Sequence, residues 1–168
     1  MSNLTPFPIA LQTPNPAFHI RPVTATDFEA LHRTCWTDRS APVAHQLLSR
    51  VLRNQARQRG TGRVVLGEQR QIIGYGQLTL WAYCAELSDL FVVEGQRSYG
   101  YGTALIQSLV RRAAALEAPC VEIGAAQSNP RALALYERLG FQRHRSVDLK
   151  LTGSQPETVI YLRIPLGA

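Results

Sequence analysis

Apolar residues recur with two different periods along the chain. A spacing of three to four positions predicts helices after Ser40, after Gly100 and after Asn129. Alternating or continuous apolar runs predict strands. The expected strands are residues 18–23, 63–67, 72–81, 85–93, 120–124, 141–151 and 158–164, and the expected helices begin at 26, 40, 100 and 129. The first helix is expected to open with a capping box, Thr26-Asp-Phe-Glu29.

The order of these elements is strand, two helices, three strands, helix, strand, helix, two strands. It predicts an α/β (α+β) protein with a mixed sheet and helices on its faces. A chain of 168 residues with 45% hydrophobic residues suits one domain with a buried core. Residues Met1–Ala17, which contain four prolines, are expected to be an extended or disordered lead-in, with the single domain spanning residues 18–168.

The composition indicates an anionic partner but does not say which one. The net charge of +6 is almost entirely due to arginine, because Lys150 is the only lysine, and such a surface attracts anions. No apolar run is long enough to span a bilayer and no leader pattern opens the chain, so a cytoplasmic protein without a membrane partner is expected. Cys35, Cys84 and Cys120 are scattered and the histidines lack metal-ligand spacing, so neither a metal nor a disulfide is expected.

A strand ending at Val93 leads through a polar loop into Arg97-x-x-Gly100-x-Gly102 and then a helix. Main-chain N–H groups at a helix start have no partner within the helix, and the helix dipole adds to their attraction for an anion. Glycine allows close approach of a phosphate, and Arg97 can add a charged hydrogen bond. The pattern lacks the Gly-Lys-Ser/Thr of a mononucleotide P-loop and the context of a dinucleotide fingerprint.

A second motif follows at Asn129-Pro-Arg-Ala132-Leu-Ala-Leu135-Tyr136-Glu-Arg-Leu139-Gly140-Phe141. Together the two motifs resemble those of the GNAT acetyltransferases. The resemblance implies a mostly antiparallel sheet of about seven strands with four helices, and a V-shaped split between the fourth and fifth strands. It also implies acetyl-CoA as the cofactor. By this resemblance, the pantetheine arm of the cofactor would contact Leu90, Phe91 and Val92. The other cofactor contacts would be Arg97, Ser98, Gly100, Tyr101, Gly102 and Thr103 at the loop and helix start, and Asn129 and Tyr136 on the opposite side.

Acetyl transfer to an amine requires a base, a polarised carbonyl and an acid for the departing thiolate. Tyr136 is the candidate acid, since a phenol is protonated at neutral pH. Glu86 is the first candidate base, and Asp89, Glu122 or a chain of waters are the alternatives. Strand alternation places Glu86 and Asp89 on opposite faces unless a bulge intervenes. A main-chain N–H near Phe91 or Val92 would polarise the carbonyl.

The resemblance therefore implies an N-acetyltransferase that acts on a small-molecule amine, a protein N-terminus or a lysine. An acyltransferase for a longer acyl-CoA and a non-catalytic CoA-binding module are the alternatives, and a homodimer is compatible with the family. The arginines at 50, 53, 57 and 59 are interpreted as a solvated helix face rather than a nucleic-acid surface. Trp36, Trp81 and Tyr83 are expected either to line the acceptor pocket or to belong to the core.

Overall fold

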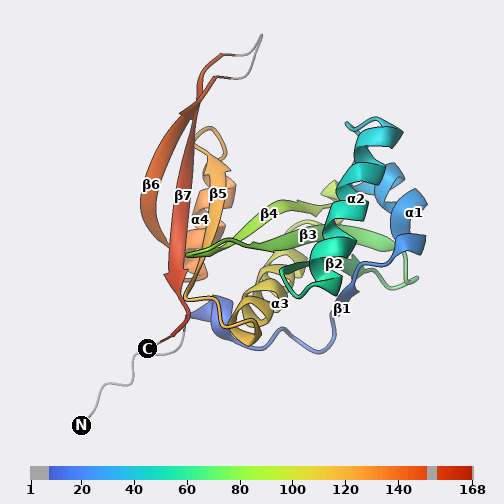
Figure 1. Cartoon of the computed structure of the whole chain (residues 1–168), viewed down its shortest axis with the longest axis horizontal. Coiled ribbons are helices and arrows are strands. Elements are labelled where there is room, and N and C mark those ends of the chain that lie inside the picture. Colours follow the sequence, from blue (N-terminus) through green and yellow to red (C-terminus); the bar gives the residue numbers. More distant parts are fainter. Residues whose placement is uncertain (1–7, 151–154, 168) are drawn as a thin grey trace.

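The central element is a seven-stranded sheet in the order β1-β2-β3-β4-β5-β7-β6 (Figure 1). The structure is a computed structural model that describes residues 8–150 and 155–167. Neighbouring strands are antiparallel except β4 and β5. The strands are β1 (His19–Pro22), β2 (Gly60–Leu66), β3 (Ile72–Leu80), β4 (Ala85–Val92), β5 (Cys120–Ala126), β6 (Gln142–Leu149) and β7 (Glu157–Pro165). The predicted fold class is confirmed.

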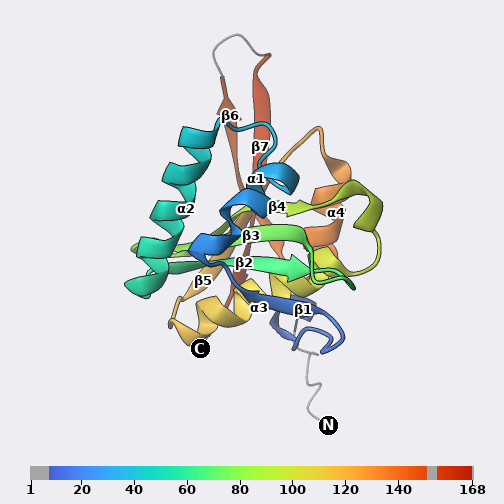
Figure 2. The ribbon, with the colours of Figure 1, turned by 90° about the vertical axis from the view of Figure 1, so that its right-hand side faces the viewer.

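Helices cover both faces of the sheet, as Figures 1 and 2 show. On one face α3 packs against strands β2 to β5 and α4 packs against β5 to β7, and on the other face α2 packs on β2 and α1 on β3. Two hydrophobic clusters result, one on each face. Residues of β2 alternate between the two clusters, which explains its continuous apolar run. The helices are α1 (Phe28–Thr34), α2 (Ala41–Ala56), α3 (Tyr101–Ala115) and α4 (Pro130–Arg138).

The sheet splits where β4 leaves β5. The two strands pair only over Ala85–Leu87 and Val121–Ile123. Beyond this point β4 keeps its pairing with β3 but has no strand partner on its other edge. This is the V-shaped opening that the resemblance implied. Figure 1 shows β5, β6 and β7 turning away from the other strands at this point.

A β-bulge in β4 begins after Ser88, one residue beyond Leu87, the last residue of β4 that pairs with β5. The register with β3 runs from Gln77 opposite Ser88 to Tyr75 opposite Phe91, so Asp89 and Leu90 together oppose Gly76. Asp89 adopts a φ of +51°, the left-handed region. A side-chain carbon at Gly76 would lie 2.6 Å from Leu90 Cδ2, so glycine is needed opposite the bulge.

Three local expectations need correction. Residues 8–17 include a short 3-10 helix, Ile9–Leu11, that docks on the domain: the Ala10 N–H donates to the Leu139 carbonyl at 2.9 Å, and Ala10 is fully buried. The earlier part of the expected lead-in, residues 1–7, lies outside the described residues. The capping box comes two residues earlier than expected, from Thr24 to Asp27, and opens a 3-10 turn before α1. Ser40 precedes α2 as expected, but its side chain makes no capping hydrogen bond.

Within the described part of the chain, no helix is both long enough and apolar enough to cross a membrane.

The Asp27 carboxylate connects β1 to the start of the first helices. It accepts two hydrogen bonds from the Arg21 guanidinium, both at 2.8 Å, and another from the Thr24 N–H at 2.8 Å. The hydrogen bonds from Arg21 are the main cause that holds the pKa of Asp27 below its ordinary value, against an opposing effect of burial. A depressed carboxyl pKa stabilises the fold above the unfolded-state pKa, and this stability is lost as the pH falls.

We therefore expect Asp27→Asn to lower the free energy of unfolding by about 1–3 kcal/mol at neutral pH. The difference should shrink below about pH 4, where the unfolded-state carboxyl takes up a proton. Urea denaturation at neutral and acidic pH measures both values. Asp38→Asn is the matched control, because the Asp38 side chain is 83% exposed. An equal loss at both pH values would contradict the role given to the charged carboxylate.

Candidate active site

A cleft of about 650 Å³ opens between the free end of β4, the start of α3 and helix α4. It brings together residues that lie up to 48 positions apart in the sequence, from Leu90 to Arg138. Of the predicted cofactor contacts, those whose residues line the cleft are Leu90, Phe91, Val92, Arg97, Ser98, Gly100, Gly102, Thr103, Asn129 and Tyr136. Tyr101 is the exception: its ring packs edge-on against Phe18, with 4.9 Å between the ring centroids.

The start of α3 is built to bind an anion. Gly100 has a φ of +91° and precedes the helix, and no side chain caps the first turn. The first-turn N–H groups of residues 101–103 therefore face the cleft end of the helix without an intrahelical partner. A side-chain carbon at Gly102 would meet only Leu135, at 3.8 Å. The fold itself thus leaves room for a ligand at Gly102.

Arginines surround this helix start. The Arg97 Nε donates to the Val92 carbonyl at 3.0 Å, which holds its guanidinium next to the end of β4. Arg131, at the start of α4, donates to the Ser98 hydroxyl at 2.6 Å and so connects the two walls of the cleft. Arg131 and Arg138 line the cleft but were missed by sequence reasoning, because both occupy variable positions of the second motif.

Tyr136 lies on the α4 wall of the same cleft. Its side chain is almost fully buried, and burial raises its pKa to about 12. No hydrogen bond joins its hydroxyl to another of the described residues. The phenol is therefore protonated at neutral pH and free to donate to a ligand in the cleft.

A second cleft, of about 540 Å³, lies on the other side of β4, towards α2. Because of the bulge, Glu86, Ser88 and Asp89 all line it, whereas Leu90 turns to the α3 side. Glu86 accepts a hydrogen bond from Trp81 Nε1 at 2.8 Å. Asp89 pairs with the Arg39 guanidinium at 2.5 Å. The two candidate bases thus share one cleft, which strict strand alternation had excluded.

Glu122, the third candidate base, is held in an ion cluster on β5. Arg163 contacts it at 2.8 Å and Arg145 at 3.1 Å, and His144 lies 3.8 Å away. Burial raises the pKa of Glu122, but the hydrogen bonds from both arginines outweigh this effect and keep the pKa below its ordinary value. A carboxylate held in this way is a poor proton acceptor.

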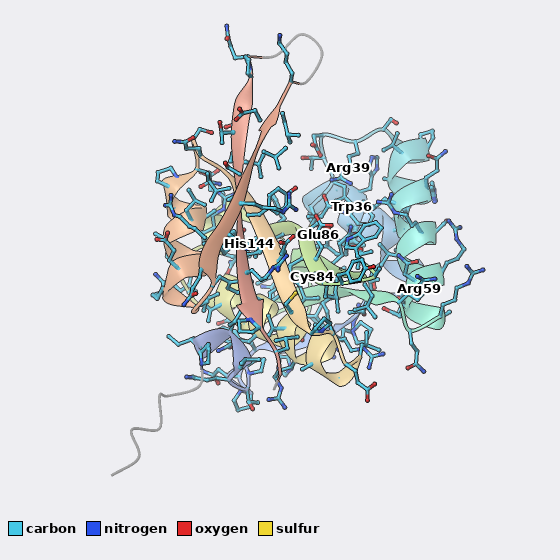
Figure 3. The ribbon with its side chains drawn as sticks, turned by 60° about the vertical axis from the view of Figure 1, so that its left-hand side comes forward. Trp36, Arg39, Arg59, Cys84, Glu86 and His144 are labelled. Carbon is cyan, nitrogen blue, oxygen red and sulfur yellow. The ribbon has the colours of Figure 1, made fainter. Side chains whose placement is uncertain are left out.

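The aromatic candidates separate clearly. Trp36 is 2% exposed and packs edge-on against Tyr75 in the core beneath α1 and α2. Trp81 lines the second cleft, whereas Tyr83 is 87% exposed and lines neither cleft. Figure 3 shows Glu86 between the β6–β7 side, marked by His144, and the α2 side, marked by Arg59.

The fold also brings together Cys84 and Cys120, with 2.6 Å between their sulfur atoms, a pairing that the sequence did not indicate.

Comparisons with known proteins agree with this geometry. The model of the acetyltransferase (GNAT) family matches residues 25–141, more than half of the chain. The chain therefore belongs to the GNAT acetyltransferase family, as its two motifs predicted. A search of curated proteins finds no match.

Solved structures share the fold at low sequence identity. An N-acetyltransferase from Staphylococcus aureus Mu50 superposes with a TM-score of 0.77 at 16% identity, over 89% of this chain and 99% of that one. A phosphinothricin acetyltransferase from Sinorhizobium meliloti, solved with AcCoA, gives 0.77 at 19% identity over 89% of each chain. A spermidine N-acetyltransferase from Vibrio cholerae, solved with CoA and spermine, gives 0.74 at 18% identity, over 90% of this chain and 97% of that one.

The ion cluster generates a prediction about Glu122. Glu122→Gln should lower the free energy of unfolding by about 1–2 kcal/mol, because Arg145 and Arg163 lose their shared partner but remain partly exposed. The rate of acetyl transfer should stay within roughly threefold of the parent. Urea denaturation and steady-state kinetics measure the two quantities. Glu137→Gln, which breaks only an exposed pair with Arg143, is the control for stability. A hundredfold loss of turnover in a folded Glu122→Gln protein would instead make Glu122 the base.

Proposed function

We propose that the protein transfers the acetyl group of acetyl-CoA directly to a primary amine. The observation that carries this proposal is the position of Tyr136, a largely buried residue that lines the same cleft as the uncapped start of α3 and whose hydroxyl lacks a partner among the described residues. A cleft that combines an anion-binding helix start with a proton donor suits a thioester whose far end carries phosphates.

The residues of the first cleft fit a CoA thioester. The free N–H groups of α3, with Arg97 and Arg131 beside them, would bind the phosphate groups. The unpaired edge of β4 at residues 90–92 offers main-chain groups to an amide-bearing arm in the way a neighbouring strand would. Acetyl-CoA, when bound, supplies the activated acetyl group.

Side chains of the protein would carry out both proton transfers of the reaction. Tyr136 remains protonated over the working pH range and would donate to the departing sulfur. On the opposite side of β4, Glu86 would take the proton from the amine, with Asp89 or an intervening water as the alternative. A main-chain N–H near Phe91 or Val92 would polarise the acetyl carbonyl.

The second cleft would hold the acceptor. Glu86, Ser88 and Asp89 lie just before Leu90–Val92 on the same strand, so an amine in the second cleft would meet an acetyl group in the first at the bulge. A volume of about 540 Å³ suits a small-molecule amine. The fold relatives named for spermidine and phosphinothricin are both acetyltransferases of small molecules by name, which supports this class of acceptor.

CoA should raise the thermal unfolding midpoint, and the rise should depend on Gly102. At a ligand concentration about 100 times the Kd, the stabilisation is about 2.7 kcal/mol and the expected shift is roughly 5–10 °C. Gly102→Glu should abolish the shift, because it brings bulk and negative charge to the helix start. Differential scanning fluorimetry measures both.

Gly95→Glu is the matched control, because Gly95 lies in the preceding loop with open space around it and outside the cleft. It should keep the full shift. Undiminished CoA binding by a folded Gly102→Glu protein would show that the phosphates bind elsewhere.

Tyr136→Phe should separate chemistry from binding. The ring packing beside Phe141 is retained, so CoA affinity should change little while kcat and kcat/KM fall by roughly 10²-fold. Because the pKa of Tyr136 is about 12, loss of its proton should not limit the parent enzyme below about pH 10, and the two proteins should share the shape of their pH profiles up to there.

Tyr101→Phe is the control, since the Tyr101 ring packs on Phe18 outside the cleft. It should turn over at close to the parental rate. A Tyr136→Phe protein with parental turnover would reduce Tyr136 to a packing residue.

A further inference from the structure

The second cleft carries more positive than negative charge. Arg50, Arg57 and Arg59 line it, and the carboxylates that line it are Glu86 and Asp89. Asp89 already forms an ion pair with Arg39, with 2.5 Å between Asp89 Oδ1 and Arg39 Nη2. The cleft therefore has one carboxylate without an ion pair and a group of three guanidinium groups at its α2 end.

These three arginines have no counter-ion among the residues that the structure describes. No carboxylate of the described residues lies within ion-pair distance of Arg50, Arg57 or Arg59. Arg50 lies on α2 and Arg57 is the C-cap residue seven positions later, so both side chains start from about the same side of the helix. The main chain of Arg59 is fixed between elements: its N–H donates to the Asn54 carbonyl at 2.8 Å, and its carbonyl accepts from the Leu80 N–H at 2.9 Å.

Glu86 marks the other end of the cleft. It makes no ion pair among the described residues and accepts from a neutral donor, Trp81 Nε1. The charge of Glu86 contributes a little to raising the pKa of Arg145, which is raised chiefly by the hydrogen bond from Arg145 to Glu122. Figure 3 shows Glu86 near the middle of the sheet and Arg59 towards α2.

We infer that the acceptor is a small amine that also carries an anionic group, such as a carboxylate or a phosphonate. This inference rests on the proposed function. The amine lies at the Glu86 end, next to the bulge, and the anion lies against Arg50, Arg57 and Arg59, which bind it by charge-assisted hydrogen bonds. A polyamine fits this cleft poorly, because its second ammonium group would lie among guanidinium groups that have no carboxylate to screen them.

Three acceptors of similar length test the charge requirement: gamma-aminobutyric acid, butylamine and putrescine. They end in a carboxylate, a methyl group and a second ammonium group, and a longer series of each kind covers other chain lengths. With saturating acetyl-CoA, the release of free CoA thiol should give the amino acids at least a tenfold higher kcat/KM than diamines of the same length. The KM of the amino acids should rise with ionic strength, because the anion is bound by exposed charges.

Variants of the arginines in and directly after α2 test whether the preference for anionic acceptors arises in the second cleft. Arg57→Gln should raise the KM for the preferred amino acid roughly tenfold and leave kcat nearly unchanged, and the double change Arg50→Glu with Arg57→Glu should reverse the preference towards diamines. Arg53→Gln is the matched control, because Arg53 lies on the same helix and is exposed but does not line the cleft. The CoA-induced thermal shift verifies that each variant is folded.

The outcomes separate the two proposals. A preference for diamines or neutral amines, or an Arg57→Gln protein with an unchanged KM, overturns the inference while the acetyltransferase function stands. No thiol release with any amine, in a protein that still binds CoA, overturns the proposed function and this inference with it. Preference for the amino acids that is lost in Arg57→Gln and kept in Arg53→Gln supports both.

Discussion

The bulge at Asp89 and Leu90 is the constraint on which the site depends. It is possible because Gly76, opposite on β3, leaves space for the Leu90 side chain. It begins after Ser88, one residue beyond Leu87, the last residue of β4 that pairs with β5. The same irregularity therefore accompanies the opening of the V, directs Leu90 towards α3 and brings Asp89 to the face that already carries Glu86. One extra residue in one strand positions the walls of both clefts.

The two clefts differ in how they use positive charge. On the α3 side, main-chain N–H groups and the arginines 97 and 131 surround a helix start at which Gly102 leaves room for a ligand. On the α2 side, Arg50, Arg57 and Arg59 share a cleft with Glu86, and none of these four side chains forms an ion pair within the described part of the chain. The net charge of +6 is thus concentrated partly at the two places where our proposals put anionic groups, which composition alone could not reveal.

Much of the fold and of the first cleft could be predicted from the sequence, because both depend on local patterns. The apolar periods predicted the element order, and of the cofactor contacts that the two glycine-containing motifs implied, all but Tyr101 line the cleft. The bulge could not be predicted, since it depends on the pairing of Gly76 with residues far along the chain. The ion cluster of Glu122 with Arg145 and Arg163, and the docking of Ala10 beside Leu139, are likewise tertiary contacts without a local signal.

Hydrogen–deuterium exchange with and without CoA tests the central claim most directly, because it reports on main-chain N–H groups one segment at a time. Binding in the first cleft should slow exchange over residues 88–92, where β4 has no strand partner on its β5 side among the described residues, and at the uncapped start of α3, residues 98–103. Exchange in α2 should change little. Protection confined to α2 and the β3–β4 turn, with the start of α3 unchanged, would contradict the placement of the cofactor.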